Sequence, residues 1–184
     1  MGMRRAPIAL LLAGSLWGGA AGAADVIAKD RFLLGSHLGY ARLVLSLKPP
    51  HARYEAVRLD PRLREAARAL LPDPPVPLAE ATHSVILELN FVDPLNQHPG
   101  EHIPYVVATL AVRHRETGEE QRLLLLPAMT PFYQYGGLLR LPRPGPYEFT
   151  LTLDPLAIPG VREPAPVTFR YRYEWTGPGG GGTR

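Results

Sequence analysis

Apolar and polar residues alternate along much of the chain with a period of two, which is the pattern of β-strands with one buried face. Clean alternation is present in residues 40–48, 83–92, 147–154 and 167–175. Residues 105–114 are apolar on both faces, as in a central strand. Shorter apolar segments at 121–126 and 137–141 complete the set. About seven short strands separated by turns predict an all-β fold, specifically an immunoglobulin-like β-sandwich.

The segment between the first two of these strands departs from the pattern. Residues 51–59 are compatible with a short, poorly patterned strand. Asp60 can cap a helix that has Pro61 at its first position, and the apolar residues that follow have helical spacing. Four prolines between residues 72 and 77 favour an extended connector. We therefore predict a helical insertion with a Pro-rich connector at residues 60–77.

The two ends of the chain have compositions that separate them from the domain. Arg4 and Arg5 precede an apolar run, and residues 21–23, Ala-Gly-Ala, fit the small-x-small rule of leader peptidase. The apolar run is shorter than the roughly 20 residues that a membrane span needs. Residues 1–23 are thus predicted to be a cleaved signal peptide, residues 24–176 a single periplasmic domain, and residues 177–184 a disordered Gly-rich tail.

Composition narrows the possible chemistry. The chain has no Cys, so disulfides, thiolate metal sites and a lipoprotein anchor are excluded. It has 20 basic and 17 acidic residues, and removing Arg4 and Arg5 with the leader leaves 18 against 17. The remaining arginines are scattered in sequence without interleaved aromatic residues, so no nucleic-acid partner is expected.

The sequence offers little for catalysis. It contains no Gly-x-Ser-x-Gly nucleophile elbow. Ser36-His37 and His83-Ser84 are adjacent pairs, but neighbours on a strand point to opposite faces and cannot form a nucleophile–base bond. We therefore expect a protein that is not an enzyme.

Histidine, carboxylate and thioether groups are the candidate metal ligands. His98, Glu101 and His102 lie within one His-Pro-Gly-Glu-His loop, and imidazole with carboxylate suits Cu(II), Zn(II) or Fe(II). An exposed polar loop is the alternative, because the spacing matches no strong metal signature. His83 is either a ligand or a core histidine at a strand end, and Met129 is either a soft ligand or a filler of the core.

An ordered series of motifs covers the chain from about residue 81 to 177. It comprises Ile-Pro-Tyr at 103–105, Thr-Gly at 117–118, Leu-Pro at 126–127, Tyr-Gly at 135–136, Gly-x-Tyr-x-x-Thr-Leu from 145, and Phe-x-Tyr-x-Tyr-x-x-Thr-Gly at 169–177. This series resembles the periplasmic Fe(2+)-transport protein family, which are small exported β-sandwich proteins of high-affinity iron uptake. The resemblance implies binding of Fe(2+) or Cu(2+), a homodimer, and an inner-membrane iron permease as partner.

The resemblance also implies where a metal site would lie. The family uses a His and a Glu on the first long strand, a Met from a Met-Pro-Met run, a His before Tyr-Gly and a His from a late loop. At the corresponding positions this chain has His83 or Ser84, Ile86, Ala128 with Met129 adjacent, and Gln134, and the late loop has no His.

Two interpretations follow. In the first, the protein handles iron or copper through a degenerate or rebuilt site that uses His83, His98, His102, Met129 or Gln134. In the second, it is a non-metal β-sandwich module that binds a partner and has lost the family's site.

Overall fold

The computed structural model describes residues 24–33, 40–55, 73–92, 99–103, 106–129, 133–155 and 166–178. These residues form two short 3-10 helices, η1 (Ala52–Tyr54) and η3 (Leu78–Glu80), and nine strands. The strands are β1 (Asp25–Leu33), β2 (Tyr40–Lys48), β3 (His83–Val92), β4 (Pro99–His102), β5 (Val106–His114), β6 (Glu120–Met129), β7 (Tyr133–Leu139), β8 (Gly145–Pro155) and β9 (Val167–Trp175). No helix among the described residues is long and apolar enough to cross a membrane.

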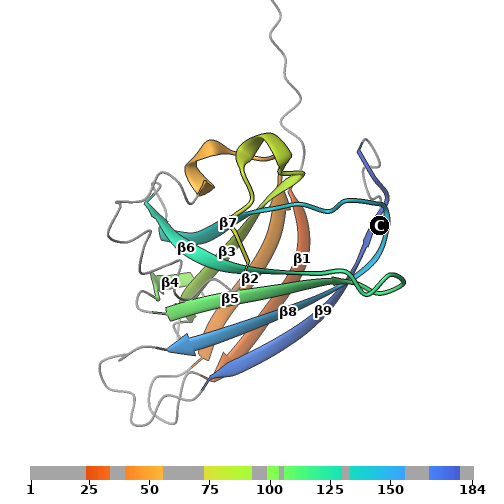
Figure 1. Cartoon of the computed structure of the whole chain (residues 1–184). Helices are drawn as coiled ribbons and strands as arrows, with labels where there is room; N and C mark the ends of the chain where they lie inside the picture. Colours follow the sequence, from red (N-terminus) through yellow and green to blue (C-terminus); the bar gives the residue numbers. More distant parts are fainter. Residues whose placement is uncertain are drawn as a thin grey trace, which may run out of the picture.

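The strands form one antiparallel path in the order β1-β2-β3-β7-β6-β5-β8-β9, and β4 pairs with β3 beside it. The path curls on itself, so that β1, β2 and β3 lie behind β5, β8 and β9, and β6 leads from one layer to the other (Figure 1). The all-β prediction is confirmed. The continuous path does not confirm the immunoglobulin-like arrangement, which has two separate sheets, and nine strands exceed the seven or so predicted.

The inward residues of the alternating strands fill the space between the two layers. Because side chains on a strand alternate between faces, each strand contributes every second residue to this core. Its most buried large side chains include Tyr135 and Phe149 together with leucines of β2, β3, β5 and β7. Burial of such side chains, at about 1.5–3 kcal/mol each, provides the main stabilisation of a fold without disulfides.

A second, smaller apolar cluster lies on the outer face of β3 and β7. Tyr54 of η1 and Val76 of the connector pack there on Ile86 and Leu138. Gly136 makes this contact possible, because a Cβ at that position would lie 2.2 Å from Cδ1 of Tyr54. Residues 52–54 therefore form a 3-10 turn that covers the sheet, and the strand predicted at 51–59 is wrong for these residues.

The other predictions about the fold are missed, met or untested in turn. Strands β1 and β4 were not predicted from the sequence. Residues 74–77 lie in no helix or strand, in keeping with the predicted connector. The predicted signal peptide, the helix that starts at Asp60 and most of the Gly-rich tail lie outside the described residues.

The two edge strands, β1 and β9, meet at a seam that side chains close. The hydroxyl of Tyr171 donates to Oδ2 of Asp30 (2.7 Å), and that of Tyr173 donates to Oδ2 of Asp25 (3.0 Å). Phe32 and Phe169 are in edge-to-face contact. No backbone hydrogen bond pairs β1 with β9 within the described residues. The end of β1 and the start of β9 come together at the bottom of Figure 1.

The tyrosine hydrogen bonds at this seam should make the free energy of unfolding fall at alkaline pH. Burial, followed by the hydrogen bond to the Asp25 carboxylate, raises the pKa of Tyr173 to about 12. A tyrosine whose pKa is higher in the folded than in the unfolded state contributes stability below pH 10, and this contribution is lost as the pH rises toward 12. We expect Tyr173→Phe to lose less stability than the wild type in urea unfolding between pH 10 and 12. Equal losses in the two proteins would contradict this role of Tyr173.

Candidate functional site

Three polar side chains meet on the outer face of β3 and β7. Nε2 of Gln134 donates to Oε1 of Glu88 (3.0 Å), and the hydroxyl of Tyr54 donates to Oε1 of Gln134 (3.2 Å). The strand register explains the meeting: Tyr135 pairs with Leu87, so the residues that neighbour them share the opposite face. The chain Tyr54–Gln134–Glu88 thus places a carboxylate, an amide and a phenol together.

Tyr54 is held in a fixed position above the sheet. It is buried, and the side chain of His51 caps the 3-10 turn to which Tyr54 belongs. The backbone N–H of His51 donates to Oγ of Ser84 (2.8 Å), which ties the turn to β3. Burial raises the pKa of the Tyr54 phenol, the Glu88 carboxylate raises it further, and Arg53 opposes both. Tyr54 therefore stays protonated near neutral pH and acts as a hydrogen-bond donor rather than as an anionic ligand.

His102 lies on the same outer face as Glu88. In the register of β3 and β4, Asn90 pairs with His102, and the next residue, Ile103, is buried in the core. Glu88 precedes Asn90 by two residues, so it shares a face with Asn90 and is the diagonal neighbour of His102. Cα atoms in that relation are about 7–8 Å apart, within the reach of long side chains.

Glu88, His102 and Gln134 therefore provide a carboxylate, an imidazole and an amide oxygen on one surface. Carboxylate and imidazole together suit divalent transition metals. Within the described residues, no group of three or more His, Cys, Asp or Glu side chains is placed to hold a metal. The described residues therefore supply few metal ligands: two strong donors, the carboxylate and the imidazole, and one weak donor, the amide oxygen.

His83 is separated from this set. It points to the opposite face of β3, where its ring contacts Trp175 edge-to-face at 5.7 Å and its Nδ1 lies 2.9 Å from Oγ1 of Thr82. Burial lowers the pKa of His83, against the influence of Asp25. From His83 to Asn90, the partner of His102, β3 advances roughly 23 Å at about 3.3 Å per residue. His83 and His102 therefore do not converge.

The remaining predicted ligands are only partly in view. His98 lies outside the described residues, as does the side chain of Met129. Ala128, at the family's Met position, pairs directly with Gln134, at the family's His position. The strand pairing therefore brings these two positions together and places Glu88 beside them.

Glu88 is the residue that the sequence interpretation missed. It lies two positions after Ile86, where the resemblance placed a carboxylate, and on the same face. Its polar character on an alternating strand was visible, but the pattern of residues 83–92 gave no reason to separate it from a solvated position. Only the register of β3 with β7 puts it against Gln134.

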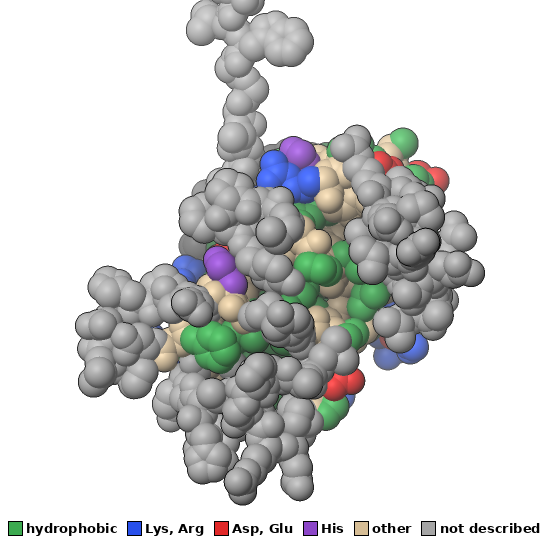
Figure 2. Space-filling model, turned by 90° about the vertical axis from the view of Figure 1, so that its left-hand side faces the viewer, with side chains coloured by type: hydrophobic (Ala, Val, Ile, Leu, Met, Phe, Trp, Pro, Cys, Tyr) green, Lys and Arg blue, Asp and Glu red, His purple; other side chains and the backbone are tan. Residues whose placement is uncertain are grey.

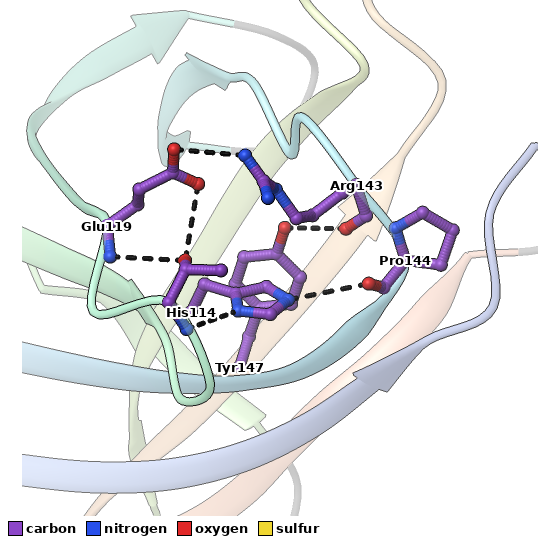
Figure 3. A network of polar contacts seen from close by, with 6 residues as sticks. His114, Glu119, Arg143, Pro144 and Tyr147 are labelled. Carbon is purple, nitrogen blue, oxygen red and sulfur yellow. Dashed lines mark hydrogen bonds and ion pairs between the residues drawn. The ribbon is translucent and has the colours of Figure 1, made fainter.

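His114 has a structural role instead. It is buried, its Nδ1 accepts the N–H of Thr117 (3.2 Å), and its Nε2 lies 3.4 Å from the carbonyl of Pro144. Figure 3 shows this ring against Tyr147, whose hydroxyl donates to the carbonyl of Arg143 (2.7 Å). The network joins the β5–β6 turn to the start of β8, and it leaves His114 no free nitrogen for a ligand.

A groove of about 650 Å³ runs beside this network, between the connector and the β5–β6 hairpin. The carboxylates that line it already have partners: Glu80 with Arg140 (3.2 Å) and Glu119 with Arg143 (3.1 Å) among them. On the face shown in Figure 2, the described charged side chains form small separate groups of both signs. Neither feature marks a particular ligand.

Comparison with known proteins supports the fold. No family model matches the chain, and no curated protein matches its sequence. A copper-bound variant of FetP from uropathogenic Escherichia coli strain F11 matches the structure with a TM-score of 0.58 and 16% identity, over 84% of this chain and 99% of that one. The copper-reconstituted P19 protein of Campylobacter jejuni matches with 0.55 and 17%, over 84% and 98%.

The fold is that of FetP and P19. A second FetP structure, of protein expressed in the periplasm of Escherichia coli, gives a TM-score of 0.54 at 16% identity, again over 84% and 99% of the two chains. The predicted likeness to exported metal-binding β-proteins is thereby confirmed at the level of the fold.

Proposed function

We propose that the chain is a periplasmic metal-binding protein whose site is rebuilt around Glu88, with His102 and Gln134 as further donors. The observation that carries the proposal is the contact between Gln134 and Glu88, at 3.0 Å on the outer face of β3 and β7. This is the place where the resemblance puts a metal site, and copper is bound by the FetP and P19 proteins of the same fold. Cleavage of the signal peptide at residues 1–23 belongs to the proposal.

The donor set limits which metal fits. An imidazole and a carboxylate suit Fe(2+) or Cu(2+), whereas Ala128 removes the thioether that would favour Cu(I). A role in iron transport, with a homodimer and an inner-membrane iron permease as partners, is the wider form of the proposal. We propose no enzymatic activity.

Binding would require a local rearrangement that the structure makes simple. Gln134 presents its amide N–H₂ to Glu88 and its oxygen to Tyr54. Rotation of the amide by half a turn would direct the oxygen to an ion held by Glu88. The N–H₂ group could then donate to the phenol oxygen of Tyr54, which accepts as well as donates. Tyr54 would thus orient Gln134 in both states.

Calorimetric titration of the metal-free mature chain with Cu(II), Zn(II) and anaerobic Fe(II) tests the proposal. We expect one ion to bind with a stoichiometry of one and an affinity in the micromolar range or tighter, and to raise the melting temperature. Binding no tighter than millimolar for all three ions would contradict it.

A partner-docking module without metal is the second candidate function. It is favoured by the hydrogen bonds that join Tyr54, Gln134 and Glu88, because each of these polar groups already has a partner within the protein. Such a module would show no ion-dependent rise in melting temperature, so the same titration separates the two functions.

A further inference from the structure

A cluster of cations lies on the outer side of the sheet where its two edges meet. Five cations at outward positions of β1, β2 and β9 form this cluster, which we call the basic face: Lys29, Arg31, Arg42, Arg170 and Arg172. A sixth outward cation, Lys48, lies at the other end of β2. All are exposed except the partly exposed Arg42. The strands alternate, and the intervening residues of β2, such as Leu43, are buried in the core. Arg42 pairs with Asn90 and is diagonal to Glu88, so the basic face borders the proposed metal site, but the inference does not rest on metal binding.

The fold brings these cations together from distant parts of the sequence. Arg31 and Arg42 are direct cross-strand partners on β1 and β2. Across the seam, Phe32 contacts Phe169 and Asp30 accepts from Tyr171 on the inward side. Arg31 alternates with Asp30 and Phe32, and Arg170 alternates with Phe169 and Tyr171, so both cations lie on the outward side of these contacts. The cations therefore form a continuous band over three strands.

The cations of the basic face take no part in the ion pairs of the described residues. The ion pairs of the described residues involve other arginines, Arg122, Arg140 and Arg143. Asp25 and Asp30 on β1 are turned to the inner side, where they accept from the seam tyrosines. Three carboxylates do lie next to the basic face: Glu148 pairs with Arg172 in the register, Glu174 follows Arg172 by two residues on the same face, and Glu88 is diagonal to Arg42. No ion pair joins any of them to the basic face within the described residues.

Protection of the sheet edges explains only part of this arrangement. Charged residues on an edge strand discourage edge-to-edge aggregation. Protection of the edge does not explain Arg42, which lies on the second strand. Arg42 is directly opposite Arg31, and like charges in that position destabilise a sheet. An anionic partner would relieve the repulsion.

We propose that the basic face docks the mature protein on the surface of an anionic phospholipid bilayer. The face is the outer side of a sheet, and its residues line neither the groove beside the His114 network nor the small cavity beside Tyr54 and Val76. It therefore suits a planar partner better than an inserted peptide. Val26, on the same outward face of β1, is 48% exposed and adds an apolar contact. Clusters of four to eight cations are the usual signature of attraction to anionic lipid.

Sedimentation with vesicles tests the proposal on the mature chain. The probe is a set of vesicles of phosphatidylcholine with or without about one third phosphatidylglycerol, at low and at physiological salt. We expect binding to the anionic vesicles alone, weakened by salt. Arg170→Gln/Arg172→Gln should reduce the partition coefficient about 30-fold. The matched control, Arg140→Gln/Arg143→Gln, has the same net charge and should bind like the wild type.

Three results would overturn the proposal. The first is absence of binding to anionic vesicles, and the second is equal weakening by the two double variants, which would reveal an effect of net charge alone. The third is binding to an acidic peptide such as polyglutamate without binding to vesicles, which would indicate a protein partner. If Arg170→Gln/Arg172→Gln melts below the wild type, Lys29→Gln/Arg31→Gln replaces it with the same expectation.

Discussion

Gly145→Ala is expected to destabilise the fold by about 2–5 kcal/mol. Gly145 begins β8 with a φ of +136°, a conformation that L side chains rarely adopt, and a Cβ there would lie 2.6 Å from Nε2 of His114. His114 cannot move aside, because it is buried and both ring nitrogens have partners. Backbone strain of about 1–2 kcal/mol and overpacking of about 1–3 kcal/mol therefore add.

Urea unfolding of Gly145→Ala and of a matched control measures the two contributions. Gly118 also has a positive φ, +76°, but the nearest atom to a Cβ there is a terminal nitrogen of Arg113 at 3.7 Å. Gly118→Ala should therefore show the strain alone, about 1–2 kcal/mol. If both variants lose the same stability, the His114 network does not fix the start of β8 as described.

Glu88→Gln is expected to weaken metal binding by more than about 100-fold. The change removes the one carboxylate of the proposed site, and even residues that only orient a metal ligand are worth 10–100-fold in affinity. The amide oxygen of a glutamine at this position can still accept from Gln134, so the fold should be kept. Calorimetric titration with the ion that the wild type binds gives the ratio.

Glu148→Gln is the control for this variant, because it makes the same change of charge on the outer face of β8. It should bind the ion like the wild type. An affinity of Glu88→Gln within threefold of the wild type, with both variants folded, would mean that the ion is held elsewhere.

The alternation of apolar and polar residues predicted several of the strands correctly. Residues 40–48, 83–92 and 167–175 coincide with β2, β3 and β9, since alternation over a half-buried sheet reflects the same burial that stabilises it. β1 was missed because the β-bulge between Val26 and Ala28 interrupts its alternation, and charged residues occupy much of the strand. The closing of the path through Tyr171 and Asp30 depends on contacts between residues far apart in sequence, which no local pattern encodes.

The candidate site was predictable only in part for the same reason. Gln134 and His102 were named from motifs, and the strand register places both near β3. Glu88 could be identified only from that register, because nothing in its own segment distinguishes it from a solvent-exposed residue. The basic face was hidden too: its residues are scattered in sequence, and the conclusion that the arginines form no cluster holds along the chain but not on the folded surface.

The most direct test of the proposed site is the position of the bound ion, located by anomalous scattering in crystals of the mature chain loaded with Cu(II). The proposal predicts a peak on the outer face of β3, within coordination distance of the Glu88 carboxylate and the His102 imidazole, with the Gln134 amide turned toward it. A peak at His83 on the opposite face, or at any site that does not include Glu88, would contradict it.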